Sequence, residues 1–119
     1  MRDFRKIKAW QLADDLVVAV YELSKGFPRE EVYGITSQLR RAASSVAANI
    51  VEGASRESRK DYAHFLQIAR GSLAETQYFL HLAKRLAYLD DAQAVAAESL
   101  AKETFACLHG LILAFRKEA

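Results

Sequence analysis

Apolar residues recur every three to four positions through four stretches of the chain, and this spacing predicts amphipathic helices. The stretches run from about residue 8 to 25, from about 31 to 52, from about 58 to 88 and from about 90 to 117. Short connections separate them, so each helix is expected to run antiparallel to the next. The pattern therefore predicts an all-α fold, an antiparallel up-down-up-down four-helix bundle, as a single domain over residues 1–119.

Residues that favour helix ends mark the boundaries of these stretches. Gly26 and Gly53 are expected to end the first and second helices, with Gly26 in the left-handed conformation that glycine adopts readily. Ser58, with an acidic residue three positions later, predicts a capping box at the start of the third helix. Asp90 or Asp91 is expected to cap the fourth.

The predicted core faces follow from the helical period. On the fourth helix the face is expected to contain Val95 or Ala96, Leu100, Thr104, Cys107, Leu111 and Phe115. The third helix has more apolar surface than one core face needs, an arc of roughly 200°. The residues that widen this arc are Ile68, Phe79, Leu82 and Leu86.

The second helix contains AASSVAANIV, residues 42–51, with no charged residue. A helix at a protein surface normally shows a charged face to water. One interpretation is that exposed alanines simply stabilise the helix, since Ala is the best helix former. The other is that a second copy of the chain covers this face, so that the protein is a homo-oligomer. The predicted oligomer interface consists of Ser44, Ala47, Ala48 and Val51.

A polar strip is expected beside the core face of the second helix, where it meets the third. It contains Arg41, Asn49 and Glu52 of the second helix and Glu75 of the third. Antiparallel pairing predicts ion pairs between Glu52 and Lys60 and between Arg41 and Glu75. The strip is expected to fix the register between two helices or two subunits. A ligand or catalytic site built from the same residues is the alternative.

Composition adds little to the question of function. The chain is 51% apolar and 27% charged, with a net charge of +2, which is an ordinary balance for a globular protein. A single cysteine, Cys107, forbids an internal disulfide and favours a reducing compartment, so we expect a cytoplasmic protein. The longest apolar runs are far shorter than the ~20 residues that a membrane span needs, so no membrane association is expected.

The sequence offers little catalytic or metal-binding chemistry. Asp61 and His64, three positions apart, do not replace the paired Glu-x-x-His motifs of a di-iron bundle, so no metal, no cofactor and no catalytic residue is predicted. Cys107 is expected in the core. One enzymatic alternative stays open, because Arg59 and His64 fit the loose Arg-x4-His pattern of helical HEPN-type ribonucleases. There Arg would hold phosphate and His would act as acid and base.

Two basic clusters make nucleic-acid binding the favoured function. Arg56, Arg59 and Lys60 follow the second helix, and a second cluster at the N-terminus contains Arg2, Arg5, Lys6 and Lys8. In an oligomer, repeated copies of such a patch produce a strong field. RNA or DNA would be bound through phosphates, since no base-reading motif is present. The alternative is that these charges only keep the protein in solution.

Several segments resemble the ribosomal-RNA intervening-sequence protein family, whose members are four-helix bundles. They are FRKIKAWQLADDLV, VYELSKGFPREEVYGITSQLRRAASSVAANIVEGASR and FLQIARGSLAET. The resemblance implies a ring-like homopentamer, and in it Gly71 and Ser72 suit close helix contact. Val51 departs from the family pattern, which usually has alanine there. The family is also similar to the accessory variability protein of diversity-generating retroelements, a basic pentamer that binds nucleic acid and a reverse transcriptase. This implies RNA, DNA or a reverse transcriptase as possible partners.

Overall fold

A computed structural model describes residues 2–118 of the chain, and the side chains of residues 2–115. Four long α-helices and two short 3-10 turns make up this part of the chain, which contains no strand. The elements are η1 (Phe4–Lys6), α1 (Lys8–Ser24), η2 (Arg29–Glu31), α2 (Ile35–Ala54), α3 (Arg59–Arg85) and α4 (Asp91–Glu118). The predicted all-α class is confirmed.

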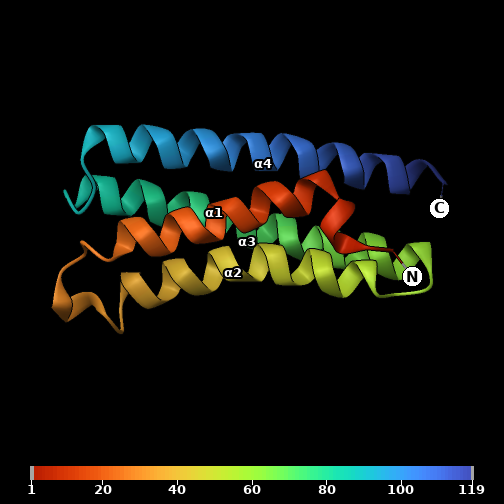
Figure 1. Cartoon of the computed structure of the whole chain (residues 1–119), viewed down its shortest axis with the longest axis horizontal. Coiled ribbons are helices and arrows are strands. Elements are labelled where there is room, and N and C mark those ends of the chain that lie inside the picture. Colours follow the sequence, from red (N-terminus) through yellow and green to blue (C-terminus); the bar gives the residue numbers. More distant parts are fainter. Residues whose placement is uncertain (1, 119) are drawn as a thin grey trace.

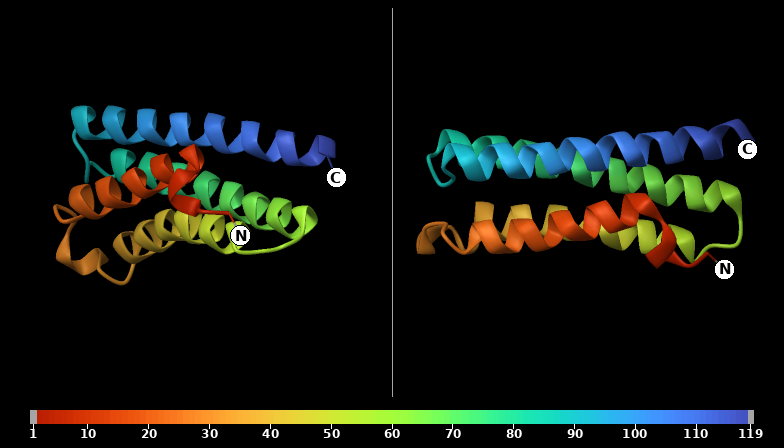
Figure 2. Two further views of the ribbon diagram at one scale, coloured as in Figure 1. Left: turned by 45° about the vertical axis from the view of Figure 1, so that its right-hand side comes forward. Right: turned by 45° about the horizontal axis from the view of Figure 1, so that its top comes forward.

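The four helices form an antiparallel bundle about 45 Å long (Figure 1). Each helix packs against its neighbours in sequence, and α1 also packs against α4. Within the described residues no Cα atom of α1 lies within 8 Å of one in α3, nor any of α2 within 8 Å of one in α4, so these pairs lie across the core from each other. Figure 1 and the right-hand view of Figure 2 place the first residues, the connection between α2 and α3 and the end of α4 at one end of the bundle. The other two connections lie at the opposite end.

Local capping signals identify two helix starts correctly. The Ser58 hydroxyl accepts a hydrogen bond from the backbone N–H of Asp61 at 3.0 Å. Asp90 and Gln93 form a reciprocal pair at the start of α4, with the Gln93 N–H donating to Asp90 Oδ1 at 2.7 Å and the Asp90 N–H donating to Gln93 Oε1 at 3.1 Å. These bonds satisfy backbone donors that have no partner within the helix.

Three details of the predicted helix boundaries are wrong, although the first helix ends at Ser24, close to the predicted position. The second helix begins at Ile35, because residues 29–31 form the separate turn η2 and Gly34 precedes the helix. Gly53 lies inside α2, which continues to Ala54. Gly26 is not left-handed, since no described glycine has a positive φ. Ala87 instead adopts φ 60° after α3, and the Tyr88 N–H donates to the Ala83 carbonyl oxygen at 2.9 Å, as in a Schellman motif.

The core face of the fourth helix is rotated from the predicted one. Val95 is 63% exposed, whereas the most deeply buried positions are Ala94, Ala97, Ala101, Thr104, Leu108 and Ile112. The larger residues Leu100, Cys107, Leu111 and Phe115 lie half-buried at the edges of this stripe. Small alanines at the centre let α4 lie close to its neighbours, so the larger side chains pack beside the contact line.

The uncharged stretch of α2 is covered largely by α1 and α3 of the same chain. Arg40 reaches Ser24 of α1, and Ser45 bonds to Ser72 of α3, so the two flanks of α2 face these two helices. Ala43 and Ala47 lie on the Arg40 flank and are buried, with Ala47 only 8% exposed. The outward strip of α2 is therefore narrower than the sequence suggests.

Candidate nucleic-acid interface at the basic end of the bundle

The fold brings the two basic clusters of the sequence to one end of the bundle. Arg2 Nη1 donates to the backbone carbonyl oxygen of Arg56 at 2.8 Å, which joins the N-terminal segment directly to the connection between α2 and α3. Residues 2–8 and 52–61 together contain seven basic and four acidic residues, a net charge of +3, whereas the whole chain carries +2. We call this region the basic end.

Aromatic rings of α3 and α4 underlie three arginines of the basic end. Each guanidinium carbon lies within the ~6 Å at which a cation is attracted to the face of a ring. The pairs are Arg2 with Tyr62 (4.2 Å), Arg59 with Phe115 (4.3 Å) and Arg56 with Phe65 (4.8 Å). Tyr62 is 2% exposed, and this burial raises its pKa. The rings fix the guanidinium groups in place, so the charged surface is partly preorganised.

The cations differ in how far acidic groups compensate them. Arg56 forms an ion pair with Glu52 one turn earlier, and Arg5 forms one with Asp3 at 3.1 Å. Hydrogen bonds from the side chain and backbone N–H of Arg5 lower the pKa of Asp3, so this carboxylate stays charged. In the described part of the chain, Lys6, Lys8 and Lys60 have no carboxylate oxygen within 4 Å. These lysines therefore carry charge that an anionic ligand could neutralise.

A hollow of about 710 Å³ opens between the two basic segments. Arg2, Ser55, Arg56 and Glu57 line it. A second hollow of about 360 Å³ beside η1 shares Arg2 and Ser55 and also includes Val51. The surface is thus a shallow, largely cationic depression and not a deep pocket. Such a shape suits contact with an extended phosphate backbone better than enclosure of a small substrate.

The polar strip between α2 and α3 forms hydrogen bonds but not the predicted ion pairs. Ser45 Oγ and Ser72 Oγ are 2.8 Å apart, and Asn49 Nδ2 donates to both the carbonyl oxygen (2.8 Å) and the hydroxyl (2.9 Å) of Ser45. Glu52 pairs with Arg56, in the connection that follows α2, and not with Lys60.

Arg41 and Glu75 line one groove of about 320 Å³ between α2 and α3, yet no ion pair joins them. Both side chains are long and exposed, so water competes effectively for their charges.

The residues predicted to contact a second copy of the chain differ in exposure. Ala48 is exposed, Ser44 and Val51 are half-buried, and Ala47 is already buried in the single chain. Ser44 also donates to the Arg40 carbonyl oxygen at 2.8 Å. Of the residues predicted to widen the apolar arc of α3, Ile68 is 39% and Leu86 46% exposed, whereas Phe79 and Leu82 are half-buried. Tyr78, which is not among them, is 55% exposed. A Cβ added to Gly71 would have no described atom within 4 Å, so this glycine makes no close helix contact within the chain.

The structure also locates the residues considered for metal and ribonuclease chemistry. Among the described residues, no group of three or more His, Cys, Asp or Glu side chains could hold a metal ion. His64 is exposed and contacts the ring of Phe65, whereas Arg59 lies over Phe115 of α4. Cys107 is a half-buried free thiol. None of the helices in the described part of the chain combines the length and apolar composition needed to cross a lipid bilayer.

Sequence reasoning identifies the arginines of the basic end but misses the rings beneath them. The helical period assigns Tyr62 and Phe115 only to the core faces of α3 and α4. The signal that could have found them is topological: in an antiparallel bundle the start of α3 and the end of α4 lie at the same end as the N-terminal arginines. Aromatic residues at those helix ends are therefore within reach of Arg2 and Arg59.

A solved structure and a protein family are similar to this chain. A protein from Bacteroides thetaiotaomicron, described as an S23 ribosomal protein family member of unknown function, superimposes with a TM-score of 0.81. It is 27% identical, and the match covers 87% of this chain and 97% of that one. No curated protein matches the chain. The sequence profile of the 23S rRNA-intervening sequence protein family matches residues 5–110. This match spans most of the bundle, and the chain therefore belongs to the 23S rRNA-intervening sequence protein family.

Proposed function

We propose that this protein is a non-enzymatic, self-associating helical scaffold that binds RNA or DNA through phosphates at its basic end. The observation that carries the proposal is the convergence of two basic segments, far apart in sequence, which the Arg2–Arg56 hydrogen bond joins. Phosphate contacts need cations at an accessible surface and no base-reading element. The exposed Lys6, Lys8 and Lys60 provide such cations.

Self-association would multiply this modest charge. A net charge of +3 at the basic end of one chain attracts nucleic acid weakly, but several copies placed side by side act on the same strand. The exposed Ile68, Tyr78 and Leu86 on α3, together with Ala48 on α2, support an interface between copies. The family resemblance supports a pentamer. The same apolar surface could instead receive a protein partner such as a reverse transcriptase.

A salt titration of RNA binding tests the proposal. The logarithm of the affinity should fall linearly with the logarithm of salt concentration, because bound phosphates release counterions. Replacing Lys6, Lys8 and Lys60 with Gln should weaken binding to all sequences alike. On single-stranded RNA it should reduce the slope by about 2 for each engaged chain, at ~0.7 for each lost contact. These lysines form no ion pairs within the described residues, so the fold should persist.

A matched control removes the same charge elsewhere. Lys84 and Arg85 are exposed in the last turn of α3, and Lys102 is exposed in the first half of α4, so all three lie away from the basic end. Their replacement with Gln changes the net charge equally and should leave most of the salt slope intact. Equal losses in the two triple variants would show that net charge alone matters and would contradict a localised interface. No RNA or DNA binding at low salt would favour the protein-binding scaffold.

The non-enzymatic part of the proposal has its own test. The parent protein should not cleave a mixed-sequence RNA, because His64 is exposed and its ring contacts the apolar ring of Phe65. Cleavage by the parent that disappears in His64→Ala would instead establish the ribonuclease alternative.

A further inference from the structure

The bundle contains a second cationic cavity at the end opposite the basic end. It has a volume of about 180 Å³ and lies where α1 passes through η2 into α2. Its polar lining consists of Lys25, Arg29, Arg40, Ser24 and Thr36. No carboxylate is among these lining residues of the described chain. A small cavity with three cations and two hydroxyls has the composition of an anion site.

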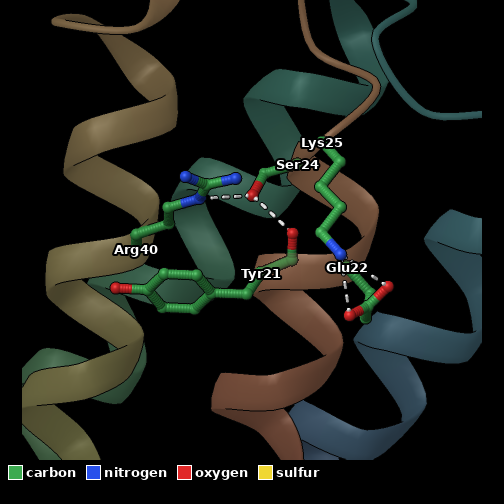
Figure 3. Close-up of polar contacts among 5 residues, drawn as sticks. All are labelled: Tyr21, Glu22, Ser24, Lys25 and Arg40. Carbon is green, nitrogen blue, oxygen red and sulfur yellow. Dashed lines mark hydrogen bonds and ion pairs between the residues drawn. The ribbon is translucent and has the colours of Figure 1, made fainter.

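Arg40 is held in a fixed orientation at this cavity. Its Nε donates to Ser24 Oγ at 2.8 Å, and its guanidinium carbon lies 4.8 Å from the centre of the Tyr21 ring (Figure 3). Ser24 Oγ in turn donates to the Tyr21 carbonyl oxygen at 3.3 Å. Arg40 has five N–H donors, and within the described residues the bond to Ser24 is the one hydrogen bond that its side chain forms. It also has no carboxylate oxygen within 4 Å there.

Thr36 supplies an independent sign that the cavity is incomplete without a ligand. The residue is 6% exposed, and its Oγ1 has no hydrogen-bond partner. Buried hydroxyl groups are nearly always hydrogen-bonded, since leaving one without a partner is unfavourable. Thr36 is the one described residue whose buried side-chain oxygen or nitrogen lacks a partner, and it forms part of the wall of this cavity.

We propose that this cavity binds a phosphate group. The planar fork of an arginine matches the oxygens of a phosphate, and hydroxyl groups add further hydrogen bonds. Charge favours phosphate over a carboxylate. Lys25 Nζ forms an ion pair with Glu22 Oε1 at 3.2 Å, so its charge is already balanced. The charges of Arg29 and Arg40 remain for a ligand to balance. A phosphate carries about −1.5 to −2 at pH 7. The volume is large enough for this group.

Phosphate titration of the whole protein, followed by calorimetry at constant ionic strength, tests the assignment. The probes are inorganic phosphate and glycerol 3-phosphate, with chloride as the background anion. Arg40→Gln should weaken binding at least about tenfold, because charge-assisted hydrogen bonds are lost. Arg41→Gln is the matched control: it removes the same charge from the next residue, which lines the groove on the α3 side. The phosphate affinity of Arg41→Gln should equal that of the parent protein.

The two probes distinguish the source of the phosphate group. Binding of inorganic phosphate alone assigns a free ion, and binding of both probes assigns the phosphate end of a larger ester. Thr36→Val supplies a second variant of nearly the same shape. It should weaken phosphate binding several-fold without lowering the thermal midpoint in phosphate-free buffer, because the hydroxyl that it removes has no partner there.

Three results would overturn the assignment. They are the absence of saturable phosphate binding by the parent, equal losses in Arg40→Gln and Arg41→Gln, and unchanged phosphate affinity in Thr36→Val. A change of oligomer mass in Arg40→Gln with phosphate affinity retained would likewise assign Arg40 to a contact between copies. The experiment is independent of RNA binding, since the cavity and the basic end lie at opposite ends of the bundle.

Discussion

Replacement of Gly53 by Ala probes the closest approach between two helices of the bundle. Gly53 is buried near the end of α2, opposite the first turns of α3. A Cβ at this position would lie 2.9 Å from Phe65 Cβ, 3.0 Å from Tyr62 Cδ1 and 3.3 Å from the Tyr62 carbonyl oxygen. Two of these atoms belong to or adjoin the α3 backbone. Relief therefore requires the two helices to move apart.

Two opposing effects decide the size of the change. Alanine is favoured over glycine inside a helix by up to about 1 kcal/mol. Overpacking of a well-filled core costs about 1–3 kcal/mol, and here the contacted atoms cannot swing away. We expect a net destabilisation of up to about 2 kcal/mol, the difference between these two effects. For a domain of this size that upper value corresponds to a fall of roughly 8 °C in the thermal midpoint.

Gly71→Ala and Gly110→Ala are the matched controls. Both glycines are exposed in helix interiors, and a Cβ at either position meets nothing within 4 Å. Each change should raise stability by about 1 kcal/mol. Thermal and urea unfolding followed by circular dichroism would compare all three variants. A Gly53→Ala protein that gains as much stability as the controls would refute the close approach of α2 and α3.

Further predictions concern single positions. Ala87→Gly should stabilise the fold by about 0.5–1 kcal/mol, measured by urea unfolding, because a left-handed conformation costs a residue with a Cβ about 1–2 kcal/mol. Ala47→Glu should unfold the chain, since it places a charge at a buried position without a partner, whereas Ala48→Glu should keep its helicity but lower the oligomer mass in sedimentation. A parent mass near 13.3 kDa at micromolar concentration would contradict self-association. The hydrogen bond from Tyr88 Oη to Glu31 Oε2 at 2.8 Å raises the pKa of Tyr88 above 10.0. The hydrogen bond therefore contributes to the free energy of unfolding fully below about pH 10, and this contribution is lost as pH rises through the folded-state pKa of Tyr88. In Tyr88→Phe the free energy of unfolding, measured at a series of alkaline pH values, should fall less steeply.

Local sequence signals predict the features that depend on near neighbours in the chain. Ser58 and Asp90 cap helices because their bonding partners lie three residues away. The prediction for Gly53 is wrong because its role depends on Tyr62 and Phe65, which only the tertiary fold brings near. A glycine near a helix end suggests a stop until the neighbouring helix is known.

The errors in the predicted core face and candidate sites also concern features that depend on the tertiary fold and not on near neighbours in the chain. The helical period locates an apolar face but not its centre when small and large apolar residues are mixed. It therefore predicts Val95 or Ala96 in the core, whereas both are exposed and Ala94 is buried. The ion pair between Glu52 and Lys60 is mispredicted because Arg56 lies only four residues after Glu52 in the chain. Pairing with this near neighbour orders fewer residues, and so costs less conformational entropy, than pairing with Lys60 on the next helix. The cavity at Arg40 is not predictable, because Ser24 and Thr36 give no signal until the fold joins them.

The even number of antiparallel helices has a practical consequence. The chain returns to the end of the bundle at which it starts, so residues 2 and 118 both lie beside the basic end (Figure 1). A purification tag or fluorophore joined at either terminus would sit over the surface proposed to hold nucleic acid. A histidine tag there could mask binding or, when protonated, mimic it. A label placed in the turn between α3 and α4 would report on the molecule from the far end and leave that surface untouched.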